Sequence, residues 1–357
     1  MMVLATNLGF PRIGDMRQLK KAVEAYWKGK STKDELLAVG KSLRAHNWQL
    51  QKDAGLSHIP SNDFAYYDQI LNMITTLGLI PSRYQHDGGK VDLDTYFAMA
   101  RGTGDAPAME MTKWFNTNYH YIVPELDSSI DFSLNASKIL SDYKGATGTG
   151  ITPKINVIGP LTFMALSKRT DGGNCFDYFQ QVLSVYRHLI QEISMLNSTV
   201  FLQMDEPVLV KDPSQEILLL LESAYGTLPE VRENVKIIVT TYFEHSCEAT
   251  ELLSETDVWG IGLDFVHAPE NMKALKKIKK QKVIAGVVDG RNIWINDIKR
   301  SVALLNTISG TIPADNIIVS TSCSLLHVPY SVKNEKESAV KNWLSFASEK
   351  CDKVSLI

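Results

Sequence analysis

Three cations stand close together where the sequence predicts the start of a helix. Residues 7–27 read NLGFPRIGDMRQLKKAVEAYW, and Arg17, Lys20 and Lys21 fall in the first two turns of the helical pattern. The free N–H groups and the dipole already make a helix start positive, so further cations are unfavourable there unless they face an anion. Arg17 and Lys20 are three residues apart and therefore share a face. This spacing predicts an anion site, and a solvated basic face is the alternative.

The backbone before this helix is expected to turn. Pro11 ends a short apolar run, the residues up to Gly14 form the turn, and Asp15 has the side chain of a helix N-cap. Leu19 and the apolar residues at helical spacing after it, up to Trp27, would form the buried face.

A fourth cation, Lys113, lies beside Trp114 in the segment EMTKWFNTNYHY. A lysine next to aromatic residues is usually a surface residue whose stem covers apolar area. It becomes part of a site if it faces the same anion as Arg17 and Lys20.

Other reactive residue types follow predicted strands. Asp205 and Glu206 are neighbours in FLQMDEPVL, and neighbouring side chains on an extended backbone point to opposite sides. One can therefore face a ligand while the other makes structural contacts. A glycosidase pair usually comes from separate strands, which argues against that chemistry.

Asp289 follows the strand VIAGVV, and Cys323 precedes His327 by four residues. A Cys/His nucleophile pair needs contact geometry that spacing does not establish.

Composition excludes several classes of protein. The chain has 357 residues, a formal net charge of -3 and 44% hydrophobic residues, which indicates neither a nucleic-acid nor a membrane-surface partner. No run of about 18 apolar residues is present, and the first residues lack the basic region of a signal peptide. The four cysteines are scattered without a C-x-x-C pair. We therefore expect a protein of the cytoplasm, where thiols stay reduced.

Eight short apolar runs alternate with helical patterns, which predicts an α/β fold with a parallel sheet covered by helices. Eight such units indicate a single (βα)8 TIM-type barrel over residues 1–357, with its polar strand ends forming a ligand-facing rim. The expected strands are Ala5–Phe10, Ser57–Ile59, Lys154–Ile158, Val200–Met204, Val235–Thr241, Trp259–Leu263, Lys282–Val288 and Asn316–Ser320.

Residues 84–150 interrupt the alternation after the second strand. We expect an insertion there, with a helix near Leu93–Arg101 and an extra strand or hairpin at Tyr119–Val123. Residues 141–152 and 168–174 are rich in Gly, Ser and Thr and are expected to be exposed loops. The remaining helices are expected at Asp34–Ala54, Phe176–Leu196, Ser214–Tyr225, Glu270–Gln281, Asn296–Ile308 and Glu335–Lys350.

Several of these segments together resemble the N-terminal half of cobalamin-independent methionine synthase. They are NLGFPRIG with RQLKKAVEAYWKGK, IPSNDFAYYDQIL, EMTKWFNTNYHYIVPE, QMDEPVLV, GVVDGRNIW and SCSLLHVP. The resemblance covers essentially the whole chain. Full-length members of this family are about twice as long and consist of two similar barrels.

The resemblance implies a function. The family transfers a methyl group from 5-methyltetrahydropteroyltriglutamate to homocysteine, and its N-terminal barrel helps to bind the polyglutamate tail. The tail-binding R-x-L-K of the family falls on Arg17, Gln18, Leu19 and Lys20, and its M-x-K-W-F lysine falls on Lys113. A string of carboxylates is an anion that such a cluster would hold through charge-assisted hydrogen bonds.

The resemblance also implies what this chain lacks. The family holds its catalytic zinc in the C-terminal barrel, with a His-x-Cys pair, a Glu and a further Cys. The corresponding positions here, by the internal duplication, are Thr241, Phe243, Asp264 and Cys323. A threonine and a phenylalanine cannot replace a histidine and a thiolate in a tetrahedral zinc site. We therefore expect neither zinc nor methyl transfer in this chain alone, no catalytic residue, and no cofactor.

Two interpretations of the function stay open. In the first, the chain is a natural or excised half of the enzyme and works with a C-terminal catalytic barrel. In the second, it is a stand-alone module that binds polyglutamylated folate or another polyanion without chemistry.

Overall fold

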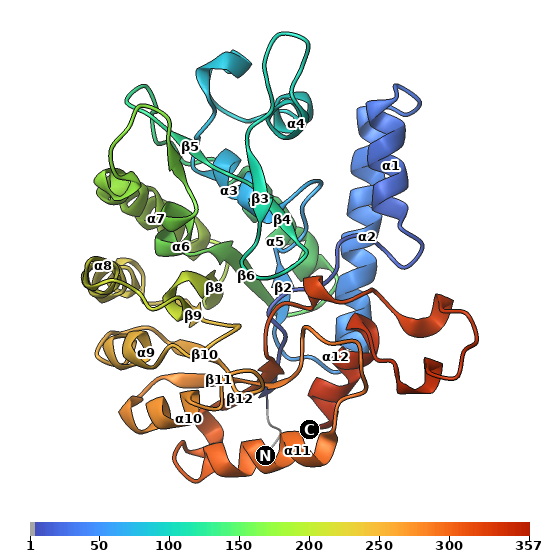
Figure 1. Ribbon diagram of the computed structural model, residues 1–357, viewed down its shortest axis with the longest axis vertical. Coiled ribbons are helices and arrows are strands. Elements are labelled where there is room, and N and C mark those ends of the chain that lie inside the picture. Colours follow the sequence, from blue (N-terminus) through green and yellow to red (C-terminus); the bar gives the residue numbers. More distant parts are fainter. Residues whose placement is uncertain (1–3) are drawn as a thin grey trace.

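Eight parallel strands form a closed barrel at the centre of the computed structural model, which describes residues 4–357 (Figure 1). Neighbours around the sheet follow the order β1-β12-β11-β10-β9-β8-β6-β2, and every pair is parallel. A parallel bridge between Thr6 and His58 joins the two ends of this order and closes the barrel. The strands are β1 (Leu4–Ala5), β2 (Ile59–Ser61), β6 (Pro153–Ile158), β8 (Val200–Asp205), β9 (Val235–Thr240), β10 (Gly260–Asp264), β11 (Lys282–Val288) and β12 (Ile317–Thr321).

A strand occurs at or beside each of the eight predicted places, and near-continuous burial explains the apolar sequences; the second strand, predicted at Ser57–Ile59, is displaced to Ile59–Ser61. In β6 all six residues are buried, as expected for strands covered on both faces. The first strand is shorter than predicted, because Gly9 has a φ of +151° and the amide of Phe10 donates to Asp63 rather than to a neighbouring strand.

Helices surround the barrel, and their buried faces explain their amphipathic sequences. In α7 (Phe179–Ser194), for example, Val182, Leu189 and Ile193 are buried against the sheet side. The other main helices outside the insertion are α1 (Gln18–Trp27), α2 (Lys33–Asp53), α6 (Pro160–Ala165), α8 (Gln215–Thr227), α9 (Cys247–Ser254), α11 (Ile298–Ser309) and α12 (Ala347–Leu356).

The insertion after the second strand is confirmed. It follows α3 (Gln69–Thr76) and contains α4 (Leu93–Arg101) and an antiparallel hairpin of β3 (Met111–Lys113) and β4 (His120–Ile122). A further two-residue strand, β5 (Glu125–Leu126), pairs with β7 (Lys168–Arg169). In Figure 1 the hairpin is drawn above β6 and β2, whereas α1 and α2 stand together to one side.

Three predicted segments are wrong. Residues 141–152 are not a loop: α5 (Ser137–Gly148) covers most of them, and Ile139, Tyr143 and Ala146 give it a buried face. Residues 335–346 form short turns rather than a helix, and α12 begins only at Ala347. The helix expected at Glu270–Gln281 is reduced to α10 (Asn271–Ala274) and one 3-10 turn.

In the described part of the chain, no helix is both long and apolar enough to cross a membrane.

Candidate functional site

The start of α1 has an unusual backbone. Arg17 occupies the N-cap position in the left-handed conformation, with a φ of 57°, and no side chain caps the helix. The prediction that Asp15 is the N-cap is therefore wrong. Its carboxylate instead accepts a hydrogen bond of 2.6 Å from the side chain of Gln18, whose own oxygen accepts one of 3.0 Å from the amide of Met16.

This geometry leaves donors free for a ligand. Within residues 4–357, the amides of Gln18 and Lys20 donate to no other group. The side chain of Arg17 is exposed and has no ion-pair partner in the same range. Lys20 is held only loosely, 3.7 Å from Glu24. Free amides, an uncapped dipole and two cations make this helix start a favourable place for an anion.

Leu19 plays a different part from its neighbours. Its side chain is 1% exposed and packs in the core with Val23, which fixes α1 against α2. The Leu19 amide is also used, since it donates to the carbonyl of Ile13. Leu19 therefore positions the segment, and the polar groups on either side of it face solvent.

Lys113 lies on a separate element, the β3 strand of the hairpin. Its side chain is exposed, whereas that of the next residue, Trp114, is fully buried and anchors the hairpin. No hydrogen bond or ion pair joins Lys113 to the start of α1 among the described residues. An indirect path does connect the two elements. The hydroxyl of Tyr67 donates to the sulfur of Met111 on β3, and the Tyr67 ring lies 6.4 Å, between centroids, from the ring of Trp27 at the far end of α1.

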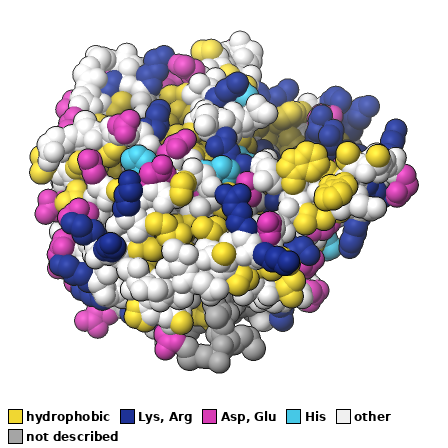
Figure 2. Space-filling model, turned by 60° about the horizontal axis from the view of Figure 1, so that its bottom comes forward, with side chains coloured by type: hydrophobic (Ala, Val, Ile, Leu, Met, Phe, Trp, Pro, Cys, Tyr) yellow, Lys and Arg dark blue, Asp and Glu magenta, His cyan; other side chains and the backbone are white. Residues whose placement is uncertain are grey.

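Figure 2 shows Lys and Arg side chains gathered at the upper right of the face that it presents, the side on which α1 and α2 stand in Figure 1. The surface is hollowed between these side chains and the body of the barrel.

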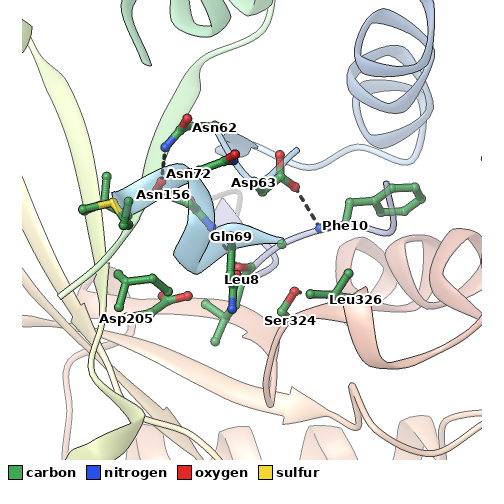
Figure 3. A pocket seen from close by; sticks show the side chains of 14 residues that line it. Leu8, Phe10, Asn62, Asp63, Gln69, Asn72, Asn156, Asp205, Ser324 and Leu326 are labelled. Atoms are coloured by element: carbon green, nitrogen blue, oxygen red, sulfur yellow. Dashed lines mark hydrogen bonds between the residues drawn. The ribbon is translucent and has the colours of Figure 1, made fainter. Parts of the chain in front are cut away.

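The barrel mouth, by contrast, is nearly filled. The cavity at the carboxyl ends of β1, β2, β6 and β8 has a volume of about 20 Å³. Since a water molecule needs roughly 10–15 Å³, this space holds about one water. Figure 3 shows its walls, including Asn62, which donates to the carbonyl of Asn156, and Asp63, which accepts from the amide of Phe10.

The adjacent carboxylates after β8 point to opposite sides, as the sequence predicts. Asp205 lines the small cavity and accepts hydrogen bonds from Gln203 and Thr240, both 2.6 Å. Burial raises its pKa to about 6, although these bonds and Lys154 oppose the shift. Glu206 turns outward instead, under the start of α6.

Glu206 is a buried structural acceptor. It is 0% exposed and accepts from the amides of Leu161 and Thr162 and from the hydroxyl of Tyr225, at 3.0, 2.6 and 2.7 Å. Burial raises its pKa to about 7 despite these bonds. A side chain at Gly159 would overlap it, because an added Cβ would lie 2.2 Å from the carboxyl carbon.

A histidine joins two strand ends on the opposite side of the barrel. His267 Nδ1 lies 3.1 Å from Asp264 Oδ2, and His267 Nε2 lies 3.4 Å from Asp289 Oδ2. The bond with Asp264, then that with Asp289, raises the pKa of His267 to about 10. Burial alone would raise the pKa of Asp289, but His267 and the amides of Arg291 and Asn292 lower it to about 2. At neutral pH the cluster is thus a cation held between two carboxylates.

Among the described residues, no ion pair joins the side chains of Asp289 and Arg291, and no hydrogen bond joins Cys323 to His327. Asp289 binds the amide of Arg291, whose side chain points elsewhere. Cys323 is fully buried, and burial raises the pKa of its thiol well above the usual value. Burial lowers the pKa of His327 to about 4, so this ring is neutral. These residues do not form a nucleophile pair.

The closed parallel sheet and its helices define a TIM-type (βα)8 barrel. Its mouth is filled, and its exposed cations lie beside the mouth, at the start of α1. Comparison with known proteins identifies the family. Residues 4–313 match the model of the cobalamin-independent synthase N-terminal domain, and the chain belongs to this family.

Curated relatives carry the name 5-methyltetrahydropteroyltriglutamate–homocysteine methyltransferase. The protein from Desulforamulus reducens is 47% identical over 98% of this chain, and the one from Nitrosomonas europaea is 41% identical over 100%. The matches cover only 46% and 47% of those two proteins, so the chain spans about half the length of these relatives.

Solved structures support the fold. The B12-independent methionine synthase from Shewanella sp. W3-18-1 superposes with a TM-score of 0.68 at 15% identity, over 99% of this chain and 96% of that one. A putative vitamin-B12 independent methionine synthase from Listeria monocytogenes gives 0.63 at 14% identity, over 100% and 96%.

The positions to which the resemblance assigns zinc ligands do not fit zinc here. Phe243 offers no ligand atom, and the Thr241 hydroxyl is bonded to Ser246 at 2.7 Å. Asp264 is engaged with His267 and with the amide of Val266. Among residues 4–357 no group of three or more His, Cys, Asp or Glu is arranged to hold a metal ion.

Sequence reasoning missed two residues of this region. His267 has one near partner, Asp264 three residues before it, but its second partner, Asp289, lies at the end of the next strand and could not be assigned from local spacing. Asp68 had a signal that was overlooked: an Asp directly before the apolar helical run from Ile70. It caps α3 and also accepts from the amide of Ile122, which ties the hairpin to the barrel.

Proposed function

We propose that this chain is the N-terminal, polyglutamate-tail-binding barrel of a cobalamin-independent methionine synthase. In this proposal, all 357 residues act as one barrel in the cytoplasm. The substrate is 5-methyltetrahydropteroyltriglutamate, and its carboxylates are bound by Arg17, Lys20, Lys113 and the free amides of Gln18 and Lys20. Methyl transfer to homocysteine takes place on a C-terminal catalytic barrel, in the same chain or in a partner.

One observation carries the proposal: the uncapped start of α1, where two cations and two free amides meet without an internal acceptor. The names of relatives that are 41–47% identical supply the anion, a triglutamate. The exposed lysines of α1 and its C-cap, Lys20, Lys21 and Lys28, agree with a ligand that carries several negative charges. Our proposal that the chain alone is inactive is supported by the filled mouth and by the residues at the zinc positions.

Methionine formation tests the division of labour. The purified chain is incubated with 5-methyltetrahydropteroyltriglutamate, homocysteine and zinc, alone and with the separately produced C-terminal half of the Desulforamulus reducens relative. We expect no methionine from the chain alone and methionine from the mixture, above the rate of the C-terminal half by itself. Turnover by the chain alone, with zinc bound in a 1:1 ratio, would overturn the proposal.

A further inference from the structure

The tip of the hairpin lies on residues from the far side of the barrel. Its turn follows Lys113 directly, and the side chain of Arg291, from the segment after β11, donates to the carbonyl of Asn116 at 3.2 Å. These two residues are 175 positions apart in the sequence, so this hydrogen bond joins the insertion to the opposite wall of the mouth.

Aromatic contacts surround this hydrogen bond. The guanidinium of Arg291 lies over the ring of Phe243, 4.8 Å from its centroid, and that ring lies 5.9 Å from the ring of Phe115 at the hairpin tip. Lys211 lies over the other part of the tip, 5.7 Å from the centroid of Phe115. The tip therefore makes a small number of specific contacts rather than a broad apolar interface.

The backbone on both sides of this contact is strained. Phe115 has a φ of 50° and Phe243 a φ of 90°, conformations that are unfavourable for L-residues. Such conformations persist only where the surroundings enforce them, and they are common at functional sites.

Arg291 is itself held in place. Its amide donates to Asp289 at 2.7 Å, and Asp289 is bound in turn by His267. The ion cluster at the ends of β10 and β11 thus fixes the residue that holds the hairpin. Within the tip, Trp114 is buried and its carbonyl accepts from the amide and the hydroxyl of Thr117, so the turn that carries Asn116 is bonded to the residue directly after Lys113.

We propose that Arg291 is a positioning residue for tail binding: by holding the hairpin tip across the barrel mouth, it sets the place of Lys113 relative to the start of α1. This inference rests on the proposed function, because it concerns the same ligand. It also gives a role to the segment DGRNIW, which contains neither a proposed tail-binding cation nor one of the positions assigned to zinc.

The test compares Arg291→Gln with Arg291→Lys and with Lys299→Gln, which removes the same charge from an exposed position nearby. Two properties are measured: hydrogen exchange of the amides in residues 111–122, and the affinities for pteroyl-triglutamate and pteroyl-monoglutamate by calorimetry. In Arg291→Gln we expect faster exchange in the hairpin and about five-fold weaker triglutamate binding, with monoglutamate binding and the urea unfolding midpoint unchanged. Arg291→Lys should recover part of both effects, and Lys299→Gln should match the unchanged protein.

Unchanged hairpin exchange in Arg291→Gln would overturn the inference. Faster exchange with an unchanged ratio of the two affinities would overturn it as well, since the hairpin would then move without affecting the tail. The proposed function has its own test, since it fails if the unchanged protein does not prefer the triglutamate over the monoglutamate. In that case Lys113 holds no tail, and the inference about Arg291 is refuted as well, whatever the exchange data show.

Discussion

The start of α1 and the ends of the barrel strands are both rich in polar residues, but they use them in opposite ways. At the strand ends the carboxylates are occupied: Glu206 accepts from two amides and a hydroxyl, and Asp264 and Asp289 share His267. At the start of α1, Arg17 is exposed and the amides of Gln18 and Lys20 have no internal acceptor among the described residues.

The difference shows that a polar residue is informative about a ligand only when the fold leaves it unsatisfied. Buried polar groups are nearly always bonded, so an acidic strand end in a barrel can be wholly structural. An uncapped helix start with cations on it has no such internal explanation. The positive end of the helix dipole repels the cations, and a bound anion would offset this repulsion. The following variants test this contrast, from the largest expected effect to the smallest.

The largest effect is expected from Glu206→Ala. This change leaves three buried donors without an acceptor, and we expect a loss of about 4 kcal/mol in the free energy of unfolding. Urea unfolding followed by circular dichroism measures it, with Glu222→Ala, an exposed position on α8, as the control. A loss below about 1 kcal/mol would show that Glu206 is not a structural acceptor.

A smaller and pH-dependent loss is expected from His267→Gln. Because the folded pKa of His267, about 10, lies above its unfolded value, folding takes up a proton between these two pH values. The stability it contributes is full below about pH 6.5 and is lost as the pH rises through 10. We expect the variant to lose about 2 kcal/mol at pH 6.5 and to lack this decline at higher pH. Urea unfolding across pH 6–10 measures both, and a parallel pH profile in the two proteins would contradict the ion cluster.

At the other region, the effect should be on binding rather than on folding. Arg17→Ala and Lys113→Ala should each weaken the binding of pteroyl-triglutamate by about 10-fold, because each removes a charge-assisted contact to a carboxylate. Calorimetry measures the affinity, with Lys21→Ala on the same helix as the matched control. If the control loses as much as the two variants, the binding reflects general positive charge and not a site.

The smallest effect is expected from Asp15→Ala. A true N-cap would cost about 1 kcal/mol on removal, but Asp15 accepts only from the side chain of Gln18. We therefore expect a change in the free energy of unfolding of about 0.3 kcal/mol or less, as for other exposed positions. A loss near the full capping value in urea unfolding would restore Asp15 as the cap.

Local patterns predicted the barrel well, since each buried strand carries its apolar run whatever its neighbours are. They failed where distant residues decide the outcome. Residues 141–148 belong to the helix α5 because its apolar residues Ile139, Tyr143 and Ala146 form a buried face that packs in the barrel wall. For the site, the cations at Arg17 and Lys113 could be proposed from spacing and resemblance. The contact of Arg291 with Asn116 depends on the closed barrel and has no sequence signal.

The central claim is that the start of α1 and Lys113 bind a polyanionic tail. It is tested most directly by titrating the unchanged chain with pteroyl-triglutamate and pteroyl-monoglutamate at low and at high salt. The account predicts that the triglutamate binds at least about 10-fold more tightly at low salt and that salt reduces this preference, since exposed charges are screened. Equal affinities for the two ligands, or a preference that salt does not change, would contradict it.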